Sequence, residues 1–207
     1  MIRLALILSL CAGPAAARCV TAEDLATGIA FARQDGRTGL VQSEGDRVIV
    51  DYATNSTGAW QDRRKTRLGI YEETWAWTPT EEYYVGGGPG AGYTYRIAGT
   101  PPAPAAGTAW KTRIAVSEFH DDGTEQGGQQ RRYTLDVTYS YLPVAEARLS
   151  GCSYRIQPVE AVYGGTHSAA RRWIYFPDLG FGLETRLTDP ETGETLARGL
   201  TALTPAR

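Results

Sequence analysis

The residues of this chain with the clearest capacity for chemistry are two histidines, His120 and His167. His120 precedes Asp121 and Asp122, and an imidazole beside carboxylates can act as a general base or a metal ligand. However, Asp122-Gly123 is a hairpin-turn signal, and adjacent residues on a strand point to opposite faces of a sheet. We therefore interpret this stretch as a turn.

His167 lies in a glycine-containing loop beside Ser168. A nucleophilic serine must be held against a base that a third group orients, and adjacency in sequence does not supply this arrangement. The chain has no Gly-x-Ser-x-Gly elbow, and its cysteines and histidines form no cluster with metal-ligand spacing. We expect no catalytic residue, no metal and no cofactor. A hydrolase that pairs one of the two histidines with a nearby acid is the alternative.

Charge and glycine spacing argue against nucleotide partners. The formal net charge is −2, so no basic excess attracts nucleic acid. The glycine-rich stretch Gly86–Gly92 lacks the Gly-Lys-Ser/Thr ending of a phosphate-binding loop, and no helical pattern follows it. We expect no nucleic-acid partner and interpret this stretch as a linker or a hairpin loop.

Aromatic residues are the most informative feature of the composition. The chain has five Trp and twelve Tyr, and many of them alternate along strand-like segments. One interpretation is that they fill the core; the other is that they line a concavity of a curved sheet that binds an apolar molecule. The candidate ligand-binding residues are Trp75, Trp77, Tyr139, Tyr141, Trp173 and Tyr175.

The elements that would position these residues are strands. In Tyr133–Tyr141, apolar and aromatic residues alternate with polar ones, which indicates an antiparallel strand with one buried and one wet face. Trp110–Phe119 predicts its hairpin partner. We interpret Arg63–Trp77 as one long strand whose basic start, Arg63 to Arg67, is exposed to solvent.

The stretch Gly151–Leu187 is the best-defined part of the predicted sheet. Pro158 lacks a backbone donor, so it predicts an edge or bulge, and Pro177–Gly180 predicts a tight turn. In total the pattern predicts an all-β fold: a single antiparallel meander of about ten or eleven strands, with little helix. We expect the sheet to curl into a barrel or half-barrel, with a β-sandwich as the alternative.

The N-terminus has the pattern of a secretory signal peptide over residues 1–17. Arg3 precedes an apolar run, and Ala15–Ala17 precede the expected cleavage site. The run is too short to span a bilayer, and we expect no transmembrane segment in the mature chain. Residues 18–207 would then form a single exported domain, periplasmic or alternatively extracellular.

Export would leave two cysteines, Cys19 and Cys152. An even number of cysteines in an oxidising compartment predicts a disulfide between them. Two free buried thiols are the alternative. The bridge would tie the N-terminus to the best-defined part of the sheet.

The segment Tyr154–Arg186 resembles a loose family of uncharacterised exported β-rich proteins of Gram-negative bacteria. The resemblance rests on Ile156-Gln-Pro-Val159, on Trp173-x-Tyr-x-Pro-Asp-Leu-Gly180 and on Gly182–Arg186. It implies a curved half-barrel similar to the periplasmic lipoprotein carriers of the Lol type. It carries no catalytic motif.

These observations favour a non-catalytic periplasmic β-protein that binds an apolar small molecule, a lipid or an envelope protein. Two alternatives stay open. One is an envelope hydrolase with a histidine and carboxylate site, and the other is an interaction module without a small-molecule site.

Overall fold

The structure is a computed structural model that describes residues 18–53, 60–79, 90–121, 128–165, 169–189 and 192–206. These residues form one short helix and fourteen strands in a single antiparallel sheet, which confirms the all-β prediction. The predicted signal peptide, residues 1–17, lies outside the described residues. The same holds for residues 80–89, which include the start of the glycine-rich stretch, and for Asp122, His167 and Ser168.

The elements follow one another as α1 (Asp24–Thr27), β1 (Ile29–Arg33), β2 (Thr38–Glu44), β3 (Arg47–Ala53), β4 (Trp60–Arg67), β5 (Tyr71–Pro79), β6 (Gly90–Ile97), β7 (Ala109–Asp121), β8 (Gln129–Tyr141), β9 (Ala145–Leu149), β10 (Cys152–Gly165), β11 (Ala169–Phe176), β12 (Phe181–Thr188), β13 (Thr195–Ala197) and β14 (Leu200–Pro205).

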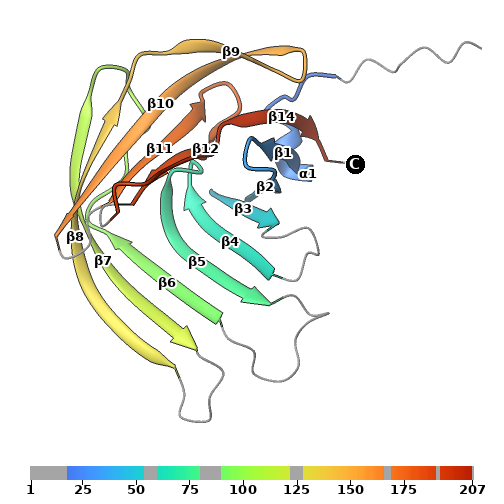
Figure 1. Ribbon diagram of the computed structural model, residues 1–207. Helices are drawn as coiled ribbons and strands as arrows, with labels where there is room; N and C mark the ends of the chain where they lie inside the picture. The colour runs from blue at the N-terminus through green and yellow to red at the C-terminus, as the bar shows by residue number, and fades with distance from the viewer. Residues whose placement is uncertain are drawn as a thin grey trace, which may run out of the picture.

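The sheet is an almost continuous meander that curls round on itself (Figure 1). Most strands pair with their neighbours in sequence, and β14 returns to pair with β1. The hydrogen-bond ladder is open between β13 and β14, but the chain crosses this gap through Arg198 and Gly199. Arg198 N–H donates to the Thr185 carbonyl, and Gln34 N–H donates to the Gly199 carbonyl, both at 2.7 Å. The predicted curled sheet is confirmed.

The strand number exceeds the prediction partly because Arg63–Trp77 is two strands and not one. Leu68 and Gly69 have positive φ values of 55° and 69°, which reverse the chain between β4 and β5. The two strands then pair with each other, with a bulge between Lys65 and Thr66. The last part of the chain also forms two strands, since β13 pairs with β12 and β14 pairs with β1.

β10 changes neighbours along its length. Its first residues, Cys152–Ile156, pair only with β9, and the resulting hairpin, which we call the arm (β9 with Cys152–Ile156), leaves the main sheet (Figure 1). From Val159 onward β10 pairs with β8. Pro158 lies at the change of partner, where a missing N–H disrupts no ladder. On its other side it stays paired with Ile174 of β11, and no bulge is present there.

Two clusters of buried side chains fill the fold. One packs the helix, β1–β3 and the arm against Phe176, Phe181 and Leu183; the other joins β5–β8 to β10 and β11. β12 is buried on both sides, because Leu183 contributes to the first cluster while Glu184, also 1% exposed, points the opposite way. The β11–β12 hairpin therefore lies inside the curl of the sheet.

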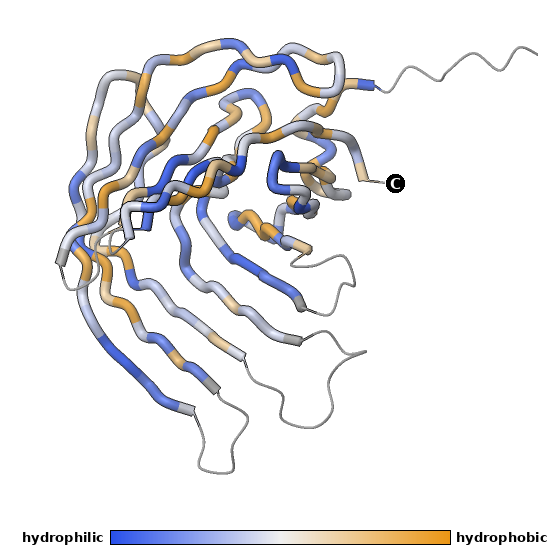
Figure 2. The backbone as a smooth tube through the Cα atoms, viewed as in Figure 1, coloured by the Kyte–Doolittle hydropathy of each residue, from blue (hydrophilic) through white to orange (hydrophobic). Residues whose placement is uncertain are grey.

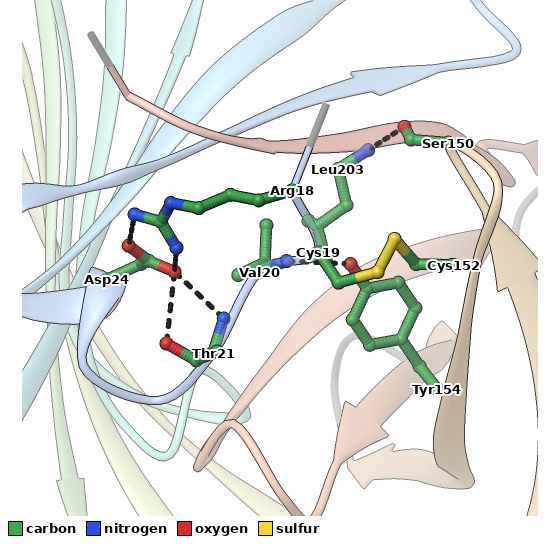
Figure 3. The surroundings of a disulfide bond; sticks show 9 residues. All are labelled: Arg18, Cys19, Val20, Thr21, Asp24, Ser150, Cys152, Tyr154 and Leu203. Carbon is green, nitrogen blue, oxygen red and sulfur yellow. Dashed lines mark hydrogen bonds and ion pairs between the residues drawn. A yellow bond between two sulfur atoms is a disulfide. The ribbon is translucent and has the colours of Figure 1, made fainter. Parts of the chain in front are cut away.

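The disulfide Cys19–Cys152 joins the N-terminus to the arm, as predicted (Figure 3). Next to it, Val20 N–H donates to the Tyr154 hydroxyl at 3.1 Å, and Leu203 N–H donates to Ser150 Oγ at 3.1 Å. The N-terminus, the arm and the last strand are thereby held together at one end of the molecule.

Candidate functional site

Four of the six predicted ligand-binding residues are core residues of the second cluster, which joins β5–β8 to β10 and β11. Tyr139, Tyr141, Trp173 and Tyr175 are at most 8% exposed. The Tyr141 hydroxyl lies 2.7 Å from the Tyr71 hydroxyl, and this pairing satisfies both polar groups inside the core. These four side chains pack against one another and leave little surface for a ligand.

The other two candidates, Trp75 and Trp77, are half-buried on β5. Trp75 stacks on Tyr93 with ring centroids 4.5 Å apart, and its indole Nε1 is buried without an acceptor in the part of the chain that the structure describes. The structure thus separates the six residues into a buried group and a partly accessible pair. Their role in ligand binding stays a prediction.

His120 is exposed near the end of β7, opposite Gln129 on β8 and Ala91 on β6. The side chain of Asp121 and the whole of Asp122 lie outside the described residues, as does His167. The hydrolase alternative, which depends on these residues, stays a prediction.

A buried network of charged side chains was not anticipated from the sequence. Arg64 on β4 donates to Glu72 Oε1 at 2.8 Å and to Glu184 Oε2 at 3.2 Å. Arg171 on β11 donates to Glu72 Oε2 at 2.8 Å, and Arg198 donates to Glu184 Oε1 at 2.5 Å. Each of these side chains is at most 14% exposed.

The network corrects the interpretation of the basic cluster as a solvated strand entry. Arg63 and Lys65 are more than 40% exposed, but Arg64 between them is 8% exposed. Figure 2 shows that β4 is hydrophilic along most of its length. Strand alternation places Asp62, Arg64 and Thr66 on one face, and this face points into the curl.

The electrostatics of the network are balanced. Asp62, 3.1 Å from Arg64, completes a set of three acids that face three arginines. Burial alone raises the pKa of Glu184, but Arg171, Arg64 and Arg198 outweigh it, and the pKa falls to about 2. The Arg64 guanidinium also lies 5.0 Å from the Tyr52 ring centroid and 5.4 Å from that of Trp75.

This arrangement is suited to holding the fold together. Arg64 and Glu72 belong to the β4–β5 hairpin. Arg171 and Glu184 belong to the β11–β12 hairpin, and these two hairpins are not neighbours in the sheet. A carboxylate that accepts bonds from two or three arginines is held in its ionised form. Glu184, whose pKa is lowered, is therefore a poor general base at neutral pH, and the network bridges the interior of the curl.

A groove between the arm and β11–β13 offers a more accessible site, with a volume of about 310 Å³. That size lies at the lower end of small-molecule sites. Its apolar lining comes from the arm, from β11 and from the first residue of β14. The lining side chains are mainly Leu149, Ile156, Ile174, Phe176 and Leu200.

Two arginines, Arg172 and Arg186, complete the groove. Both lie near a single acid, since Glu160 Oε1 is 3.4 Å from Arg172 Nε and 3.1 Å from Arg186 Nη2. The Arg172 contact lacks hydrogen-bond geometry, so its Nε–H is buried without an acceptor among the described residues. An apolar groove with one surplus positive charge results.

Within the described residues, no group of three or more His, Cys, Asp and Glu side chains is placed to hold a metal ion. The helical part of the described chain is too short to cross a membrane.

No protein-family model, no curated protein and no solved structure matches this chain.

Proposed function

We propose that this chain is a non-catalytic, exported binding protein that takes up an apolar ligand with an acidic head group, such as a fatty acid, in the groove between the arm and β11–β13. The groove is the observation that carries the proposal. It combines apolar side chains with an arginine pair that has only one acidic partner among the described residues.

The chemistry of the groove matches this ligand class. Burial of a hydrocarbon chain is favourable by roughly 0.8 kcal/mol per CH₂ group. The side chains of Arg172 and Arg186 are 33% and 40% exposed, so a carboxylate in the groove can accept charge-assisted hydrogen bonds from their guanidinium groups. A neutral chain of equal length would gain the apolar contacts alone.

A periplasmic location is part of the proposal. The N-terminal sequence pattern supports export, and the Cys19–Cys152 disulfide is of a kind that persists in oxidising compartments. Fractionation of cells that produce the full chain tests this part, with the processed protein expected among periplasmic proteins. Recovery of the unprocessed chain in the cytoplasm would contradict it.

Equilibrium dialysis with dodecanoate and with dodecanol tests the ligand. We expect the protein to bind dodecanoate more tightly than dodecanol. Arg186→Gln should weaken dodecanoate binding about fivefold, as expected for one partly exposed ion pair, and leave dodecanol binding unchanged.

A blocking variant locates the site. Ala197 is exposed and lines the groove, so the indole ring of Ala197→Trp should occupy it and abolish binding of both probes. Ala109→Trp, at an exposed strand position on β7, is the matched control and should bind normally. The proposal fails if the unaltered protein binds neither probe, or if Ala197→Trp binds both unchanged.

A further inference from the structure

A second groove lies on the outward-facing side of β6–β8, with a volume of about 560 Å³. The buried side of these strands carries Ile114, Val116 and Leu135. Strand alternation therefore turns Ala115, Ser117 and their cross-strand partners outward. The groove is separate from the one between the arm and β11–β13, because no residue lines both.

Two rows of side chains cross this groove. In one row Thr94 on β6 faces Ser117 on β7, which faces Arg132 on β8. In the next row Arg96 faces Ala115, which faces Thr134. The small side chains of Ala115 and Ser117, on the central strand β7, form the floor of the groove. Arg96 and Arg132 lie diagonally opposite each other across it.

The spacing allows both arginines to reach one group. Adjacent strands are roughly 4.8 Å apart and successive rows on one face roughly 6.8 Å, which separates the Cα atoms of Arg96 and Arg132 by about 12 Å. Arginine side chains are long enough to converge from that distance over the floor formed by Ala115 and Ser117.

The charges at this groove are uncompensated. Among the described residues, neither Arg96 nor Arg132 has an acid within ion-pair distance. The nearby acid on this face, Asp136, is 3.1 Å from Arg113. Ser117 Oγ accepts from the Gln130 side chain at 3.3 Å, so its own O–H remains available to donate. The chain as a whole has a formal net charge of −2, so the positive charge at this groove is local.

We propose that this groove binds a phosphate-ester group. Two guanidinium groups match the charge and the fork geometry that phosphate oxygens favour, and the hydroxyl groups of Thr94, Ser117 and Thr134 add donors around the same space. The ligand is a soluble phosphate ester or the phosphate of a lipid head group, which share this chemistry.

Titration calorimetry with glycerol 3-phosphate and co-sedimentation with phosphatidylglycerol vesicles test the proposal. Glycerol and phosphatidylcholine vesicles serve as ligand controls. Arg96→Gln/Arg132→Gln should weaken binding at least about tenfold, since each charged hydrogen bond removed contributes strongly. Binding should also fall as salt is raised.

The protein control is Arg148→Gln/Arg155→Gln, which removes two exposed arginines from the arm. Calorimetric binding of glycerol 3-phosphate that the groove variant loses and the arm variant keeps would identify a soluble ester as the ligand. Binding to phosphatidylglycerol vesicles alone, with the same pattern, would identify a lipid head group. The proposal is overturned if the unaltered protein binds neither probe, or if the two double variants lose binding equally.

Discussion

Arg64 on β4 and Glu184 on β12 are 3.2 Å apart inside the curl of the sheet, although 120 residues separate them in sequence. Glu184 is 1% exposed and is shared by Arg64, Arg171 and Arg198. Removal of one member of a buried charge set leaves its partners uncompensated, and this is strongly destabilising.

Glu184→Gln should therefore lower the free energy of unfolding by about 3 kcal/mol, measured by urea denaturation at pH 7. Glu160→Gln is the matched control, since Glu160 is 34% exposed and also contacts two arginines. Because these side chains are partly exposed to solvent, we expect a loss below about 1 kcal/mol. Equal losses in the two variants would show that burial of the network adds nothing.

Acid should weaken the fold through the same residue. The pKa of Glu184 in the folded protein is about 2, against an ordinary value of 4.5. A lowered pKa contributes stability that is fully present above about pH 4.5 and is lost as the pH falls toward 2. At neutral pH, the lowered pKa of Glu184 should contribute about 3 kcal/mol to the free energy of unfolding.

The measurement compares unfolding free energies of the unaltered protein and Glu184→Gln between pH 6 and pH 2. The difference between them should shrink across the window from 4.5 to 2. A difference that stays constant with pH would contradict the assignment of the lowered pKa to Glu184.

The turn between β4 and β5 contacts the edge of β12 through backbone atoms. Gly182 N–H donates to the Leu68 carbonyl at 2.7 Å, and a Cβ on Gly69 would lie 2.1 Å from the Gly182 carbonyl oxygen. Gly69→Ala should therefore destabilise the protein by several kcal/mol, on the order of 3 to 4, since a steric clash adds to the strain of a positive φ.

Gly45→Ala is the control for that substitution. Gly45 has a similar φ of 63°, but a Cβ there would meet nothing within 4 Å. Gly45→Ala should lower the free energy of unfolding by the backbone strain alone, roughly 1 to 2 kcal/mol. Thermal or urea unfolding checks both, and equal effects would mean that the β4–β5 turn does not contact β12 in solution.

The disulfide should also contribute to stability. Replacing both Cys19 and Cys152 with Ser removes a cross-link between residues 133 positions apart. The chain-entropy model gives an upper bound of about 5 kcal/mol for a loop of that length. We expect a lower urea midpoint for the variant under oxidising conditions, and the unaltered protein should match it after reduction. An unchanged midpoint would contradict a stabilising role.

The sequence by itself determined the β-rich fold, the turn at Pro177–Gly180 and the disulfide partners. These properties depend on local patterns or on a simple count. Polar and apolar residues alternate along β8, which indicates a strand, and Pro177–Gly180 indicates a turn. Without the predicted signal peptide, the chain has two cysteines, which leave one pairing. The division of Arg63–Trp77 into β4 and β5 was missed because Leu68, a residue that rarely adopts positive φ, takes part in the turn.

The tertiary structure alone decided what the strands carry into the interior and how the grooves form. Alternation indicates that Arg64 and Thr66 share a face, but it does not say whether that face meets solvent or Glu184. Only the curl of the sheet brings β4 and β5 to β11 and β12. Likewise, only the departure of the arm from β8 opens a groove beside Ile174. Long-range placement depends on the path of the whole chain, and local sequence patterns do not encode it.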